Sequence, residues 1–181
     1  MARRKTLGDA FLIYSTFTSP GDPFCFGDGS LASPCPCGNF GVTAHGCQNS
    51  AGSGGAQLSV AGTTVPDTVV MTSAWELSGV PTIFLQGNAN IPSGASFGDG
   101  LRCAGGVLKR LYVKNADVSG TATAPVVGDL SITSRSAVLG DTIPPGGVRY
   151  YQAYYRDPNS TFCPVPSGNT WNASSGQILT W

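Results

Sequence analysis

Apolar and polar residues alternate over short stretches of this chain, and segments rich in glycine, proline, asparagine and aspartate separate those stretches. Val69, Met71 and Trp75, for example, can face a core together, because side chains alternate between the two faces of a strand. No apolar pattern keeps a helical period beyond two turns. We therefore predict strands at residues 10–18, 57–61, 68–75, 81–86, 107–114, 130–139, 148–156 and 177–181.

About eight short strands at fairly even spacing are typical of an antiparallel β-sandwich or jelly roll. The chain has 181 residues, a length that suits one domain. Residues 22–181 are predicted to form a single β-sandwich module, and residues 1–21 an N-terminal segment with a lone strand. The predicted fold class is all-β.

A loop rich in glycine and proline, residues 25–47, contains four of the six cysteines and the only histidine. Its few apolar side chains cannot form a core, and its glycines and prolines disfavour a helix or a central strand. Cross-links or a metal must therefore order it. We expect a disulfide-stapled loop.

Zinc is the alternative ligand for this loop, because Cys35, Cys37, His45 and Cys47 could form a Cys3His site. We favour disulfides, since the spacing is unusual for zinc and the other cysteines would still need partners. Other connectivities stay open. The pairing that we expect is Cys103–Cys163, Cys25–Cys37 and Cys35–Cys47.

The charge balance argues against a nucleic-acid partner, since Lys and Arg together number 10, as do Asp and Glu. An even number of cysteines indicates an oxidising compartment, so we expect a secreted or cell-surface protein. The basic start at residues 2–5 is not followed by a complete export signal. The chain is then a piece of a longer exported protein or begins after a removed signal. No apolar run is long enough for a membrane helix.

A hydrolase pattern, Gly-x-Ser-x-Gly, occurs at residues 94–98 with Ser96 at its centre. The flanking residues favour neither the strand nor the helix that a nucleophile elbow needs, and His45 precedes the serine. The only glutamate is Glu76. We expect no enzymatic activity.

The sequence Phe-Gly-Asp-Gly occurs twice, at residues 26–29 and 97–100. Asp28 and Asp99 could offer carboxylates to calcium, which prefers oxygen ligands. A tight turn is the favoured interpretation, because aspartate bonds its own backbone in such turns and glycine accepts a positive φ. No cofactor is expected, with calcium as the remaining candidate.

The predicted strand at residues 148–156 has tyrosines on both faces. We expect Tyr151 and Tyr155 to pack inward. The outer face would then present Tyr150, Gln152 and Tyr154, which together with Trp171 could stack on sugar rings. The alternative is that a second sheet or a loop covers these outer residues.

The run at residues 9–18 has no neighbouring hairpin partner in the sequence. A strand so placed can complete its own sheet or be donated to another copy of the chain. Both of its faces are largely apolar, as a buried strand requires. The residues predicted to mediate self-association are Phe11, Leu12, Ile13 and Tyr14.

Several motifs carry a family resemblance: Phe-Gly-Asp-Gly, Cys-Pro-Cys-Gly-Asn, Phe-Gly-Asp-Gly-Leu-Arg-Cys-Ala-Gly-Gly and Tyr-Tyr-Arg-Asp-Pro. Residues 22–181 resemble a cysteine- and glycine-rich module of secreted or surface proteins of planctomycete-like bacteria. The resemblance implies an extracellular location and this fold, and it implies no reaction.

We therefore expect a non-catalytic extracellular module that has a structural or adhesive role at a cell surface or in an extracellular assembly. Its partners would be other protein chains, including copies of itself. A carbohydrate-binding module is the second interpretation, and a secreted hydrolase is the third.

Overall fold

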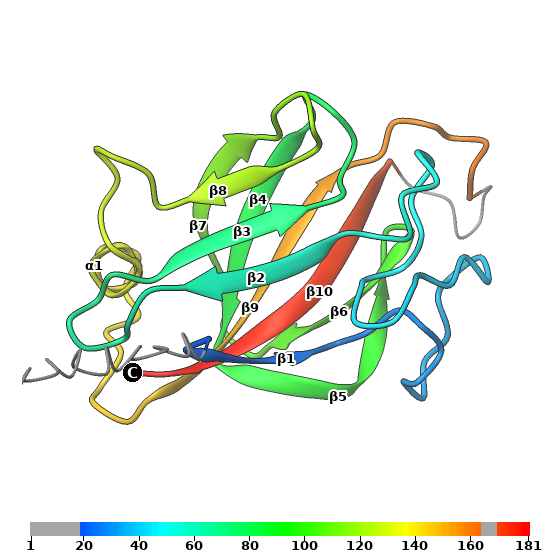
Figure 1. The fold of residues 1–181 in the computed structure, drawn as a ribbon. Coiled ribbons are helices and arrows are strands. Elements are labelled where there is room, and N and C mark those ends of the chain that lie inside the picture. Colours follow the sequence, from blue (N-terminus) through cyan, green and yellow to red (C-terminus); the bar gives the residue numbers. More distant parts are fainter. Residues whose placement is uncertain (1–18, 164–169) are drawn as a thin grey trace, which may run out of the picture.

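The computed structural model describes residues 19–163 and 170–181, which form ten strands and one short helix (Figure 1). The prediction of an all-β, antiparallel fold is confirmed. The predicted strand at residues 10–18 lies outside the described residues. In chain order the elements are β1 (Gly21–Phe24), β2 (Gln57–Ala61), β3 (Val70–Ala74), β4 (Pro81–Gly87), β5 (Ala89–Phe97), β6 (Gly100–Gly105), β7 (Lys109–Asn115), β8 (Ala122–Ala124), α1 (Ile132–Val138), β9 (Val148–Arg156) and β10 (Trp171–Thr180).

A five-stranded sheet, in the order β1-β10-β9-β4-β7, runs through the middle of the molecule. The sheet β2-β3-β8 lies against one face, and the hairpin β5–β6 lies against the other face (Figure 1). All of the strand pairs are antiparallel. The central sheet is therefore covered on both sides.

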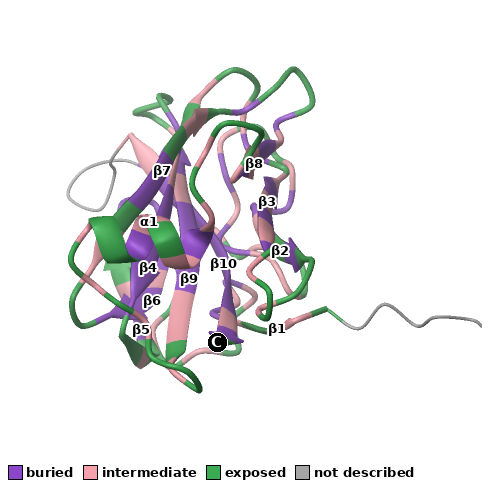
Figure 2. Ribbon diagram, turned by 90° about the vertical axis from the view of Figure 1, so that its left-hand side faces the viewer, coloured by how far each residue is buried: buried purple, intermediate pink, exposed green. Residues whose placement is uncertain are grey.

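The main core fills the space between the five-stranded and three-stranded sheets (Figure 2). Leu58 and Met71 on one sheet meet Phe84 and Tyr151 on the other, and all four are almost fully buried. Burying each such side chain stabilises the fold by roughly 1.5–3 kcal/mol. The inward orientation predicted for Tyr151 is confirmed, as is that of Tyr155.

A second, smaller core lies on the opposite face of the central sheet. Leu101 on β6 and the disulfide Cys25–Cys103 are buried there, with Phe24 and Leu31 packed around them. This core holds the β5–β6 hairpin and the start of the cysteine-rich loop against β9 and β10.

The prediction of a strand at residues 130–139 is wrong, because α1 occupies most of this stretch. Ile132 and Ser136 are its buried residues, and their spacing of four places them on one helix face. Gly140, with a φ of +79°, follows the helix and suits a chain reversal at its end.

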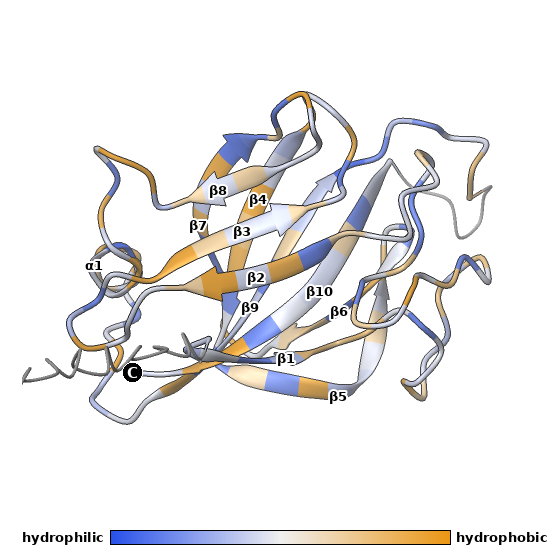
Figure 3. Cartoon of the chain, in the orientation of Figure 1, coloured by the Kyte–Doolittle hydropathy of each residue, from blue (hydrophilic) through white to orange (hydrophobic). Residues whose placement is uncertain are grey.

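The last strand is longer than the predicted residues 177–181, for a different reason. β10 begins at Trp171 and not at residue 177, and most of its residues are buried although they are small or polar. Figure 3 shows most of the first part of this strand as pale to blue, unlike the more hydrophobic β2. Strands β5 and β6 were also missed, because glycine and Pro92 interrupt their apolar pattern.

Candidate functional site

Three disulfides order the cysteine-rich loop. Cys35–Cys47 closes within the loop, whereas Cys25–Cys103 and Cys37–Cys163 hold the loop to the rest of the fold. The predicted pair Cys35–Cys47 is confirmed, whereas Cys103–Cys163 and Cys25–Cys37 are wrong. Cys25 directly follows β1 at one edge of the central sheet, and β6 brings Cys103 to it with a Cα–Cα distance of 5.8 Å. The sequence gives no sign that β6 crosses this face.

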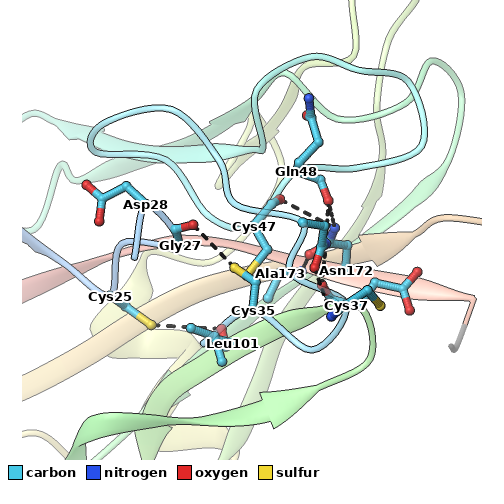
Figure 4. The surroundings of a disulfide bond; sticks show 12 residues. Cys25, Gly27, Asp28, Cys35, Cys37, Cys47, Gln48, Leu101, Asn172 and Ala173 are labelled. Atoms are coloured by element: carbon cyan, nitrogen blue, oxygen red, sulfur yellow. Dashed lines mark hydrogen bonds between the residues drawn. A yellow bond between two sulfur atoms is a disulfide. The ribbon is translucent and has the colours of Figure 1, made fainter. Parts of the chain in front are cut away.

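Polar contacts supplement the small core to which the loop contributes Cys25, Leu31, Cys35 and Cys47 (Figure 4). The side chain of Asn172, on β10, donates to the carbonyl of Gln48 at 3.0 Å. Asn39 donates to the carbonyls of Gln48, at 2.7 Å, and Asp99, at 2.8 Å. A side chain at Gly27 would collide with the backbone of Cys47. Close backbone packing and disulfides therefore fix this loop.

The zinc interpretation of this loop is wrong. Cys35, Cys37 and Cys47 are in disulfides and offer no thiolates. The ring of His45 donates from Nδ1 to the carbonyl of Gly55 at 2.6 Å. Within residues 19–163 and 170–181, no group of three or more His, Cys, Asp or Glu side chains is placed to hold a metal ion.

The two Phe-Gly-Asp-Gly segments have different environments. The Asp28 carboxylate accepts hydrogen bonds from the backbone and hydroxyl of Ser30, at 3.1 and 2.6 Å, and these bonds lower the pKa of Asp28. This is the turn that we favoured. Asp99 is buried, and its backbone N–H donates to the carbonyl of Trp171 at 2.8 Å.

Ser96 lies within β5, opposite Leu101 of β6. A nucleophile elbow places its serine on a sharp turn between a strand and a helix. The position of Ser96 within a hairpin strand does not have this geometry.

Gln152 does not face solvent as predicted, because only 2% of its surface is exposed. Its Oε1 accepts hydrogen bonds from the backbone N–H groups of Cys103, at 2.7 Å, and Ala104, at 2.9 Å. Its Nε2 donates to the carbonyls of Leu101, at 3.1 Å, and Ser174, at 3.0 Å. The β5–β6 hairpin thus covers this part of the outer face of β9.

Both tyrosines predicted on the outer face, Tyr150 and Tyr154, pack against aromatic rings from other elements. Tyr150 meets Phe24 edge to face, with ring centroids 5.7 Å apart. Tyr154 meets Phe97 of β5 in the same way at 5.4 Å, and Trp171 lies 6.2 Å from Phe97. The structure therefore brings Tyr154 and Trp171 together around Phe97, while Gln152 separates Tyr150 from them.

The exposure of Trp75 was not predicted from the sequence. It was predicted to face the core, but it is 47% exposed and has a φ of +62°. Its carbonyl accepts hydrogen bonds from Asn49 Nδ2, at 2.8 Å, and Ser53 Oγ, at 2.6 Å. Its ring lies on the imidazole of His45 with centroids 4.5 Å apart. An aromatic side chain is thus presented to solvent in a fixed position.

Glu76, the next residue, is buried beneath this surface with 4% exposure. Burial raises its pKa to about 7, although the hydroxyls of Ser73 and Thr82 oppose the rise. Thr82 Oγ1 donates to one carboxylate oxygen. Glu76 is therefore largely protonated below neutral pH.

No family model, curated protein or solved structure matches this chain. Within the described residues, no helix has the length and apolar character needed to cross a membrane.

Proposed function

We propose that the protein is a non-catalytic extracellular module that acts as a structural or adhesive part of a cell surface or an extracellular assembly. Three disulfides support an oxidising, extracellular environment, since such bonds persist there and are rare in the cytosol. They also suit a module that must keep its shape outside the cell.

The observation that carries the adhesive role is the presentation of Trp75. A positive φ at a bulky residue is a genuine outlier, and such strain costs about 1–3 kcal/mol. About half of the Trp75 side chain remains exposed, so its burial contributes little to the stability of the fold. Tryptophan is enriched at binding interfaces, and a rigid ring loses little entropy when it binds. Strain held at an exposed tryptophan therefore favours a binding role.

The partners that we propose are other protein chains, including further copies of this chain. Self-association would use the N-terminal residues Phe11 to Tyr14, which lie outside the described residues. The second candidate partner is a polysaccharide, and the cluster around Phe97 supports it through two stacked arginines.

The test is to locate the protein and measure its binding to the cells that produce it. We expect the protein in the extracellular or envelope fraction, with all six cysteines oxidised. The purified, oxidised full chain should bind isolated envelopes saturably. Cytoplasmic protein with free thiols, or no retention on envelopes, would refute the proposed function.

A further inference from the structure

A pocket of about 200 Å³ lies on the outer face of the central sheet, beside the β5–β6 hairpin. Strands β4, β5, β6, β7 and β9 all contribute to it. These strands are hydrogen-bonded within their sheets, so the pocket walls are rigid. The lining residues are Leu85, Phe97, Arg102, Leu108, Arg110 and Tyr154.

Two aromatic rings and two guanidinium groups dominate this pocket. The Arg102 guanidinium lies 5.5 Å from the centroid of the Phe97 ring, and that of Arg110 lies 5.9 Å from the centroid of Tyr154. The two rings meet almost at right angles, with an interplanar angle of 88°. Stacking on the rings orients both cations without neutralising them.

Neither arginine is ion-paired within the described part of the chain, where the ion pairs are Lys114–Asp129 and Arg149–Asp141. Arg102 Nε is buried and has no hydrogen-bond partner among the residues that the structure describes. Both guanidinium groups line the pocket, so their positive charges are available to an anionic ligand there.

We propose that this pocket binds a carboxylated sugar residue of an acidic polysaccharide. The carboxylate would bind the planar guanidinium groups of Arg102 and Arg110, whose donors match its two oxygens. The sugar ring would cover the faces of Phe97 and Tyr154. This inference rests on the proposed extracellular function and names the chemistry of one partner.

The volume and lining of the pocket favour a single sugar residue over a drug-sized molecule or an acidic peptide side chain. Sites for drug-sized molecules usually occupy about 300–1,000 Å³, more than this pocket provides. An aspartate or glutamate of an acidic peptide would satisfy the cations, but its narrow stem would leave the aromatic rings exposed to water. A pyranose ring satisfies both parts of the pocket.

The test uses the oxidised full chain and titration calorimetry with two probes, a galacturonic acid oligomer and the neutral galactose oligomer of equal length. The acidic oligomer should bind, and the neutral one should bind at least about tenfold more weakly. Arg102→Gln and Arg110→Gln should each reduce affinity for the acidic oligomer by about tenfold or more. Affinity should also fall as salt is added.

Lys114→Gln is the matched control, because it removes one positive charge from β7 at a side chain that pairs with Asp129 and does not line the pocket. It should leave the affinity unchanged. An equal loss in Lys114→Gln and Arg110→Gln would show nonspecific attraction and overturn the proposal. Binding of a glutamate oligomer as tightly as the sugar would also overturn it.

Failure of this inference and failure of the proposed function give different results. If the protein binds envelopes but not the galacturonic acid oligomer, the pocket assignment is wrong and the adhesive function stands. If the protein is not retained on envelopes at all, the proposed function is wrong, whatever the oligomer does.

Discussion

The Gln152 side chain accepts a hydrogen bond of 2.7 Å from the backbone N–H of Cys103, and so joins the central strand β9 to the hairpin strand β6. The same side chain bonds to Ala104, Leu101 and Ser174. One amide thus fastens the outer layer to the central sheet beside a disulfide.

Replacing Gln152 with leucine should therefore destabilise the whole module. The change leaves several buried backbone groups without partners, and each such group costs about 1–3 kcal/mol. We expect the free energy of unfolding in urea to fall by at least about 3 kcal/mol. Val148→Thr, at the exposed start of the same strand, should change it by less than about 0.5 kcal/mol. A Gln152→Leu protein as stable as the wild type would contradict this account of the outer layer.

The disulfides should contribute unequally to stability. Cys25–Cys103 spans 78 residues and Cys35–Cys47 spans 12, and the entropy removed from the unfolded chain grows with the span. Replacing both cysteines of the first pair with alanine should cost about 1.5 kcal/mol more than doing so for the second. Thermal melting of the two double variants measures this. Peptide mapping without reductant should recover all three pairs, and a Cys103–Cys163 peptide would contradict the connectivity.

Stability should also fall as the pH rises from about 4.5 to about 7, because of Glu76. Its pKa rises from 4.5 to about 7 on folding. Between these values the folded protein binds a proton that the unfolded chain has released, so raising the pH favours unfolding. The loss over this range is roughly 3 kcal/mol. Asp129 and Asp141 have lowered pKa values, so they titrate below this range.

The substitution Glu76→Gln removes the titrating carboxyl and so tests whether Glu76 causes this pH dependence of stability. The pH profile of the variant should lack the fall between pH 4.5 and 7, and the variant should be the more stable protein above neutral pH. Asp117→Asn, at an exposed turn, should keep the wild-type profile over that range. An unchanged profile in Glu76→Gln would exclude Glu76 as the cause.

The sequence predicted the fold where burial follows apolar alternation. The bounds of β2 and β9 agree with the predicted 57–61 and 148–156. The pattern failed in β10, where a covered strand buries asparagine, serine and glutamine beneath other backbone. It also failed in α1, because this helix has only 7 residues and one of its two buried residues is a serine, so no helical apolar pattern is visible.

The candidate site was harder to predict, since it depends on contacts between distant segments. The sequence singled out Tyr154, but Arg102 and Arg110 line the same pocket only because β6 and β7 fold against the same region. Gln152 was placed on the correct strand face, and nothing in the sequence shows that a hairpin covers it. The positive φ of Trp75 has no local sequence signal either.

Deleting residues 1–18 tests the predicted role of the N-terminal run. If residues 9–18 are donated between copies, the full chain should self-associate in analytical ultracentrifugation and the shortened chain should be monomeric. The peptide 9–18 should then bind the shortened chain. Ile13→Asp should reproduce the effect of the deletion, because a charge is costly in a buried strand. A full-length protein that stays monomeric at high concentration would refute donation.

The most direct test of the proposed adhesive function is to measure stability and envelope binding together in Trp75→Gly. Glycine accepts a φ of +62° without strain, so the variant should unfold within about 1 kcal/mol of the wild type. It should nevertheless lose at least about tenfold in affinity for envelopes, as expected for an interface tryptophan. Val65→Thr, at an exposed site elsewhere, should bind normally. A Trp75→Gly protein that binds envelopes as tightly as the wild type would contradict the account.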